Sequence, residues 1–280
     1  MRTPITDRTR ELLQSARYEV LPTSTITDKV LAHAAPGLTF TVTASTSLGL
    51  EATLRVAEDL QRAGRRAVPH LAARMISGKD QLREVVARLS EAGITEVFVP
   101  GGDATPPAGD YVEALDLLRD LQDISPTFTE IGVAGYPEPH PVISDAALRQ
   151  ALDSKSPYAT NLVSNLCFDP SVLGRWVSDL RSRGFELPLL LGIPGKVQLA
   201  KLASVASAIG VGESAKFLRR NTSTFARLLR PDGYAPHRLI ERVLRDIPDA
   251  AEGVAGLHIY TFNQIAKTEQ WRVQQLGNLG

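Results

Sequence analysis

Eight short apolar segments, separated by longer amphipathic ones, constrain the fold of this chain more than any other feature. They cover residues 16–22, 38–44, 66–72, 95–101, 130–136, 160–168, 187–193 and 256–262. Short apolar runs bounded by turn residues predict buried strands. Because helical segments stand between them, the strands are expected to run parallel and to be joined by right-handed crossovers.

Helices are predicted wherever apolar residues recur at intervals of three and four between these strands. The predicted helices cover residues 50–64, 79–93, 111–122, 145–152 and 171–184. Several stop on a glycine, namely Gly64, Gly93 and Gly184, as helices with a left-handed C-terminal cap do. The stretch 194–255 is too long for one crossover and predicts two or three helices, at 196–210, 214–230 and 236–247, and a final helix follows at 263–276.

Eight strand–helix units fit a closed (β/α)8 TIM barrel better than an open doubly wound sheet. Such barrels commonly use about 250 residues as one domain. No linker or low-complexity segment divides the chain. We therefore expect an α/β fold, a single (β/α)8 barrel over residues 1–280 with extra helices before the last strand.

Composition excludes several classes of protein. The chain has 31 Lys and Arg against 31 Asp and Glu, so no broad field attracts nucleic acid. Cys167 is the only cysteine, which excludes an intramolecular disulfide and a thiolate metal cage. The five histidines are scattered, so no metal site is predicted. The polar start and the absence of an 18-residue apolar run predict no signal peptide and no membrane span, hence a cytoplasmic protein.

Polar residues stand at or just beyond the ends of the predicted strands. In TIM barrels the carboxyl ends of the strands form the active-site face. The candidates are Glu19, Thr43, His70, Asp103, Tyr136, His140, Asn165, Tyr260 and Asn263.

Each candidate also has a structural interpretation. Glu19 could face the barrel interior as a proton donor, or face outward and pair with a Lys or Arg. Asp103 could form a tight turn or cap a helix starting near Pro107. His70 and His140 could hydrogen-bond a carbonyl instead of a ligand.

These strand ends resemble those of the methylenetetrahydrofolate reductases, flavoprotein (β/α)8 barrels that reduce methylenetetrahydrofolate to 5-methyltetrahydrofolate. The resemblance runs from about residue 17 to 276. It is carried by RYEVLP (17–22), AVPHLAAR (67–74), VFVPGGD (97–103), GYPEPHP (135–141), NLVSNLCFD (161–169) and HIYTFN (258–263), of which GYPEPHP and HIYTFN are the most specific.

The resemblance implies a role for each matching residue. Glu19 would be the general acid that protonates the substrate, and Asp103 would bind the pterin and stabilise developing positive charge. Asn165 stands where the family has a pterin-binding glutamine. Gln264 stands where it has an arginine that contacts the folate tail, and Tyr260 would also bind substrate. The residues implied to line the cofactor pocket are Thr43, His70, Tyr136 and His140.

The chain departs from the family where flavin is bound. The family arginine that helps to hold FAD is Gly101 here, and the basic segment after the fifth strand keeps only Lys155 and gains Asp153. Two phosphate charges without cationic partners would be bound poorly. The pattern resembles the flavin-independent branch, in which NADH or NADPH passes hydride directly to the folate.

This resemblance implies an oxidoreductase of one-carbon metabolism and methionine biosynthesis. Three alternatives remain open at this point: an FAD-dependent reductase of the same reaction, a folate-dependent demethylase or methyltransferase, and a catalytically silent pterin-binding barrel. The sequence leaves the choice between NADH and NADPH, and the oligomeric state, undecided.

Overall fold

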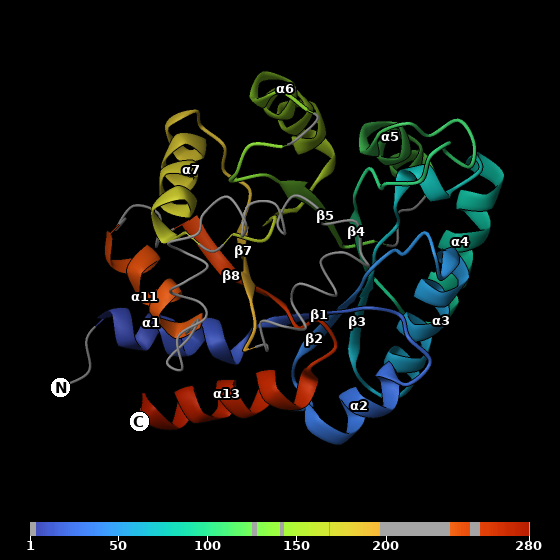
Figure 1. Ribbon diagram of the computed structural model, residues 1–280. Helices are drawn as coiled ribbons and strands as arrows, with labels where there is room; N and C mark the ends of the chain where they lie inside the picture. The colour runs from blue at the N-terminus through green and yellow to red at the C-terminus, as the bar shows by residue number, and fades with distance from the viewer. Residues whose placement is uncertain are drawn as a thin grey trace.

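Eight parallel strands form the centre of the computed structural model (Figure 1). The structure describes residues 4–124, 128–140, 143–167, 169–196, 236–246 and 253–279. The strands are β1 Arg17–Val20, β2 Thr39–Val42, β3 Arg66–Pro69, β4 Glu96–Val99, β5 Glu130–Gly135, β6 Asn161–Ser164, β7 Leu189–Pro194 and β8 Val254–Tyr260. Each lies within two residues of a predicted apolar segment or inside it, so all eight predicted strands are confirmed.

The sheet is nearly closed into a barrel. Its strand order is β3-β2-β1-β8-β7-β6-β5-β4, which leaves β3 and β4 at the two edges. Those edges meet through a bridge between His70 and Phe98, where the backbone N–H of Leu71 donates to the carbonyl of Phe98 at 2.8 Å. The predicted α/β class and (β/α)8 architecture are therefore confirmed.

Helices surround the sheet (Figure 1). They are α1 Pro4–Gln14, α2 Ile26–His33, α3 Gly49–Arg62, α4 Lys79–Glu91, α5 Ala114–Ile124, α6 Asp145–Lys155, α7 Pro170–Ser182, α11 Pro236–Asp246 and α13 Ile265–Asn278. The structure confirms the helices predicted at 236–247 and 263–276, whereas those predicted at 196–210 and 214–230 lie outside the described residues. The sequence analysis predicted no helix at the positions of α1 and α2.

Alternation along β1 decides which side chains enter the barrel. Tyr18 points outward, because its hydroxyl donates to Glu269 on α13 at 2.7 Å. Arg17 points inward, because it pairs with Glu96 of β4 at 3.1 Å and with Glu130 of β5 at 2.8 Å. Successive side chains of a strand point to opposite faces, so Glu19 lies on the inner face with Arg17.

Glycine ends α3 as the sequence predicted. Gly64 has φ +77°, and its N–H donates to the Gln61 carbonyl at 3.0 Å. Because a left-handed backbone costs an L-residue about 1–2 kcal/mol, Gly64→Ala is expected to lower the free energy of unfolding by about that amount. Gly37 has an ordinary φ and open space around its Cα, so Gly37→Ala is the matched control and should be neutral or stabilising by up to ~1 kcal/mol. Urea unfolding of both variants measures the difference, and equal effects would contradict the cap assignment.

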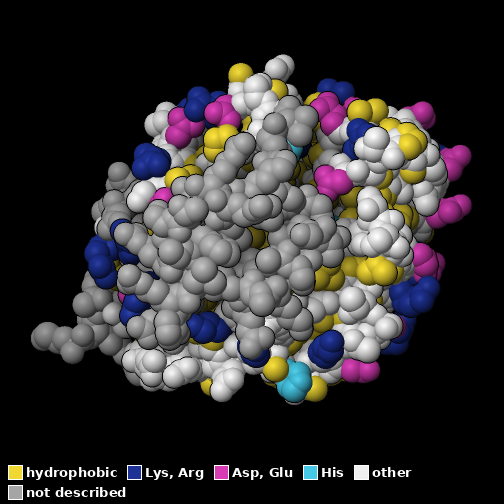
Figure 2. Space-filling view, in the orientation of Figure 1, with side chains coloured by type: hydrophobic (Ala, Val, Ile, Leu, Met, Phe, Trp, Pro, Cys, Tyr) yellow, Lys and Arg dark blue, Asp and Glu magenta, His cyan; other side chains and the backbone are white. Residues whose placement is uncertain are grey.

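Charges of both signs are interspersed over the described surface that Figure 2 shows. Neither Lys and Arg nor Asp and Glu gather there into a broad patch of one sign. This distribution agrees with the balanced composition. Among the described helices, none combines the length and the apolar character that crossing a membrane requires.

Candidate active site

Glu19 lies inside the barrel, close to the carboxyl ends of the strands. Its carboxylate Oε2 is 3.0 Å from Nε2 of His258 on β8, and the two side chains are 16% and 2% exposed. Its backbone carbonyl accepts a hydrogen bond from Thr261 Oγ1 at 2.6 Å, which ties β1 to the end of β8. The interpretation of Glu19 as an outward-facing partner of Lys or Arg is therefore wrong.

Two histidines share the interior with Glu19. His70 follows β3 at the seam of the barrel and is 6% exposed, and its ring packs against Phe98 at a tilt of 49° with 4.6 Å between ring centroids. Burial, and next the charge of His258, lower the pKa of His70 to about 3. The ring of His70 is therefore neutral at physiological pH, with its Nε2 unpartnered among the described residues.

Two tyrosines connect Glu19 electrostatically to Asp103. Tyr260 is the register partner of Glu19, and its hydroxyl donates to the Ser164 carbonyl at 3.3 Å. Burial raises the pKa of Tyr260, and the negative charge of Glu19 adds to the rise. Burial likewise raises the pKa of Tyr136, helped by the charge of Asp103. Glu19 and Asp103 therefore each add to the raised pKa of one of these tyrosines, and both tyrosines are neutral at physiological pH.

Asp103 is exposed on the loop after β4. The preceding Gly102 has φ +86°, and a Cβ there would lie 2.9 Å from Ala72 Cβ, so the loop needs glycine at this point. The first helix after Asp103 begins at Ala114. The interpretation of Asp103 as the cap of a helix near Pro107 is therefore wrong, and its exposed side chain lies within electrostatic range of Tyr136.

Thr43 and His140 lie on loops of the same face. Thr43 follows β2, where its N–H donates to the Val20 carbonyl at 2.9 Å, and its buried Oγ1 has no partner among the described residues. The His140 ring packs edge-on against Tyr136 at 5.5 Å, and its Nδ1 accepts from the Ile143 N–H at 3.2 Å. His140 thus has a structural bond as well as a place beside Tyr136.

Asn165 and Gln264 lie beyond the ends of β6 and β8. The Asn165 N–H donates to the Gly135 carbonyl at 2.7 Å, and its Oδ1 accepts from the next residue's N–H at 2.9 Å. Gln264 precedes α13, is 8% exposed and has an unpartnered Nε2 among the described residues. Asn263, with φ +57°, bonds both backbone groups of Leu21. Asn263 therefore has a structural role in joining the ends of β1 and β8.

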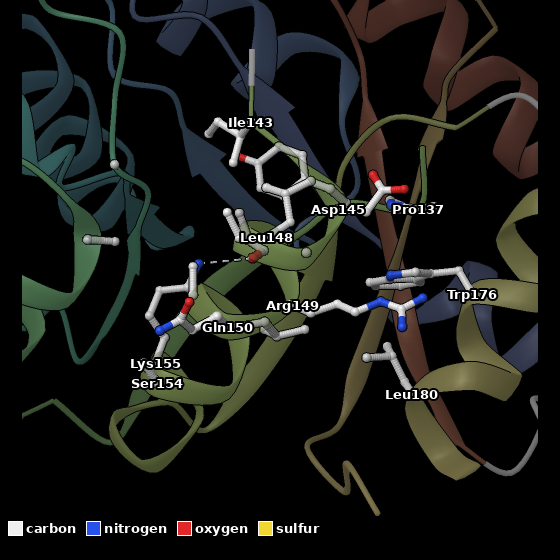
Figure 3. A pocket seen from close by; sticks show the side chains of 18 of the residues that line it. Pro137, Ile143, Asp145, Leu148, Arg149, Gln150, Ser154, Lys155, Trp176 and Leu180 are labelled. Carbon is white, nitrogen blue, oxygen red and sulfur yellow. Dashed lines mark hydrogen bonds between the residues drawn. The ribbon is translucent and has the colours of Figure 1, made fainter. Parts of the chain in front are cut away.

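A cavity of about 560 Å³ opens beside Tyr136, between α6 and α7 (Figure 3). Trp176 and Arg149 face it, and Lys155 enters it from the end of α6. Lys155 Nζ donates to the Ala134 carbonyl at 3.3 Å, and burial lowers the pKa of this lysine. The arginines at this cavity are already paired, Arg149 with Asp179 and Arg183 with Asp153.

Glu138 also lines this cavity. Burial raises the pKa of Glu138 to about 7, although the Cys167 thiol partly offsets the rise by donating to Oε1 at 3.8 Å. Cys167 itself is fully buried, as predicted for a small apolar side chain. Glu138 therefore changes its charge near neutral pH.

This shift predicts a pH dependence of stability. In the unfolded chain Glu138 loses its proton near its usual value of 4.5, whereas the folded protein keeps the proton up to about pH 7. The folded state then binds more protons within that window, so stability falls as pH rises from 4.5 to 7. Glu138→Gln should remove roughly 1–2 kcal/mol of this fall, after allowance for partial exposure. Urea unfolding at pH 5 and pH 7 measures it, and identical pH dependence in both proteins would contradict the shift.

Sequence reasoning missed two residues of this site. His258 opens the HIYTFN motif but was not selected as a site residue, although it stands two positions before Tyr260, on the same side of the strand by the period-two rule. Glu138 lies inside the GYPEPHP motif but was not selected. Within the described ranges, no group of three or more His, Cys, Asp or Glu side chains could hold a metal ion.

Comparison with known proteins gives one family. The family model "Methylenetetrahydrofolate reductase" matches residues 27–274. "Methylenetetrahydrofolate reductase 2" of Saccharomyces cerevisiae is 28% identical over 96 residues, 32% of this chain and 16% of that protein. "Methylenetetrahydrofolate reductase (NADH) 1" of Arabidopsis thaliana is 24% identical over 208 residues, 66% of this chain and 34% of that protein.

The matched regions thus span about a third or less of these curated relatives. A solved Toxoplasma gondii structure assigned to a deoxyribose-phosphate aldolase aligns with a TM-score of 0.48 at 12% identity, over 96% of this chain and 98% of that one. This likeness is too low to support an inference about function.

Proposed function

Because this chain belongs to the methylenetetrahydrofolate reductase family, we propose that it reduces 5,10-methylenetetrahydrofolate to 5-methyltetrahydrofolate with NADH or NADPH. The overall reaction consumes one hydride and one proton and yields 5-methyltetrahydrofolate and NAD(P)⁺. The nicotinamide cofactor would supply the hydride. The observation that carries the proposal is a largely shielded carboxyl group, Glu19, 16% exposed on the inner face of the barrel at its carboxyl end.

Glu19 would supply the proton. Its O–H bond breaks as a bond forms to N10 of the folate, and the C–N10 bond of the five-membered ring then opens to leave an N5-iminium cation. This cation is the hydride acceptor.

Asp103 and Asn165 would hold the pterin. Asp103 lies within electrostatic range of Tyr136, and its exposed carboxylate could stabilise the positive charge that develops on the pterin. Asn165, at the end of β6, would reach the pterin with a side chain one methylene shorter than glutamine. Tyr260 beside Glu19 would contact the reacting end of the folate, and Gln264 its tail.

The cofactor side of the mouth fits a nicotinamide donor. Thr43 Oγ1 and His70 Nε2 are buried polar atoms without partners among the described residues, which a ligand amide could satisfy. Tyr136 and His140 stand next to the 560 Å³ cavity and would line the same pocket.

Weak phosphate binding favours a nicotinamide cofactor that dissociates after each turnover, rather than a tightly bound flavin. The cationic side chains at the cavity are engaged by carboxylates or by a carbonyl, and Gly101 supplies no charge. A diphosphate would therefore be held loosely. Loose binding suits NAD(P)H, which must leave after each turnover, and we infer that the hydride passes directly to the folate without FAD.

One experiment tests both parts of this proposal. The purified protein is first examined for a flavin absorption band, and anaerobic NADH and NADPH oxidation is then followed with and without methylenetetrahydrofolate. Folate-dependent oxidation by a colourless protein is the expected result. A yellow protein with stoichiometric FAD would overturn the flavin-free route, and methyl transfer to tetrahydrofolate without nicotinamide would instead indicate a demethylase. Folate binding without turnover would indicate a silent pterin-binding barrel.

A further inference from the structure

Glu19 is paired with His258 inside the barrel. Within the described chain, the hydrogen-bond partner of its carboxylate is His258, with 3.0 Å between Oε2 and Nε2. Both side chains are shielded from solvent, His258 almost completely. An acid and a base at this distance hold protons jointly, since the charge of one alters the proton affinity of the other.

The opposite edge of the His258 ring faces a small polar cavity. Its Nδ1 has no partner among the described residues, and the same holds for Thr41 Oγ1 and Asn161 Oδ1. These three side chains line a cavity of about 10 Å³, which has room for one water molecule. Such a water could accept from an Nδ1–H, because it would have oxygen partners of its own. The proton of the neutral ring would then reside on Nδ1, leaving Nε2 free to share a proton with Glu19.

The other charged groups around His258 are already balanced. Arg17 of β1 lies next to it in register and pairs with Glu96 of β4 and Glu130 of β5. Arg66 of β3 also pairs with Glu96, so two arginines face these two carboxylates. His70, after β3, is neutral because its pKa is lowered to about 3. Tyr260, on the same strand, has a raised pKa and is neutral as well. Glu19 therefore remains the unbalanced carboxylate beside this ring among the described residues.

We propose that His258 is a positioning residue that keeps Glu19 supplied with its proton at neutral pH. The proton resides between Oε2 and Nε2, as carboxylic acid beside neutral imidazole or as carboxylate beside imidazolium. When Glu19 delivers it to the folate nitrogen, the O–H bond breaks, the ring is left neutral, and the next proton comes from solvent. The catalytic part of this inference rests on the proposed reduction, whereas the shared proton does not.

An activity-independent measurement tests the shared proton. The ¹⁵N signals of the His258 ring are followed from pH 4 to pH 10 in the wild-type protein and in Glu19→Gln, with His258→Gln used for assignment. Removal of the opposite charge should move the change in these signals at least about one pH unit downward, a tenfold loss of proton affinity. The ring of His33, exposed on α2, is the internal control and should not shift. An unchanged His258 titration would overturn the proposal.

The pH profile of kcat/KM tests the consequence for catalysis. A carboxyl–imidazole pair keeps its last proton to higher pH than a carboxyl group alone, because the imidazole can hold that proton. His258→Gln should therefore lose tenfold or more activity between pH 5 and pH 7 relative to the wild type over the same interval. His33→Gln should follow the wild-type profile. A loss in His258→Gln that is equal at every pH would mean a structural role and would overturn the proposal. If the wild-type protein had no reductase activity but Glu19→Gln still shifted the ¹⁵N titration of His258, only the proposed reaction would be refuted.

Discussion

Glu19→Gln is expected to lower kcat for methylenetetrahydrofolate reduction by about 10²- to 10⁴-fold, the usual loss when a general acid is removed. The amide keeps the size of the carboxyl group and can still hydrogen-bond His258, but it has no acidic proton to give. Because the change leaves the walls of the mouth intact, binding of the folate should persist. Stopped-flow oxidation of NAD(P)H under anaerobic conditions gives the rate, and fluorescence titration gives the folate affinity.

Glu91→Gln is the matched control for this prediction. Glu91 is exposed at the end of α4, away from the strand ends that carry the site, and its replacement should leave the rate unchanged. A Glu19→Gln protein that retained a rate within a few-fold of the wild type would remove Glu19 from the mechanism. Equal losses of folate binding and of rate would instead indicate a binding role.

The barrel itself could be predicted from the sequence because its strands are buried on both sides. A strand such as β7 is apolar at nearly every position, and all of its residues are buried. That pattern needs no knowledge of distant contacts. Of the two helices that escaped prediction, α2 is only eight residues long and packs against α13 and α3, so its helical state depends more on those contacts than on a local pattern. The amphipathic pattern of α1 is as clear as that of α4, which was predicted, so α1 could have been found from the sequence.

The site could be predicted only as a set of strand ends. The sequence identified Glu19, His70 and Tyr260 as residues of one rim, but it left the direction of Glu19 undecided. The direction depends on which residues of β1 point into the barrel, and Arg17 and Tyr18 reveal this only through partners more than seventy residues away in the sequence. His258 lies beside Glu19 because of the register between β1 and β8, and no local sequence pattern contains that register.

A second network holds the other side of β1. The outward-facing Tyr18 hydroxyl donates to the Glu269 carboxylate at 2.7 Å, and Arg272 donates two hydrogen bonds of 2.8 and 2.9 Å to the same carboxylate. Arg272 also donates to the Leu13 carbonyl at 3.1 Å, and Glu269 accepts from the Ala35 N–H at 3.1 Å. One buried ion pair thus joins β1 to α13 and to the ends of α1 and α2.

Arg272→Met is therefore expected to lower the free energy of unfolding by about 3–5 kcal/mol, because it leaves the Glu269 carboxylate buried without its cation. Burial tends to raise the pKa of Glu269, but Arg272 and Tyr18 outweigh it and hold the pKa below its usual range. In the wild type this stabilisation is present above the pKa that Glu269 has in the unfolded chain, and it is lost as pH falls through the lower pKa of the folded protein. Without Arg272, ionised Glu269 should destabilise the folded state increasingly as pH rises. The loss of unfolding free energy in Arg272→Met should therefore be larger at pH 7 than at pH 4.

Urea unfolding at both pH values measures this effect, with Arg62→Met as the control. Arg62 pairs with Asp59 at 2.6 Å, but both side chains are exposed, so its loss should cost only about 0–1 kcal/mol at either pH. If Arg272→Met cost no more than Arg62→Met, the buried network would not anchor β1. A large cost that did not depend on pH would assign the loss to packing of the arginine stem, because only an unpaired carboxylate makes the deficit grow with pH.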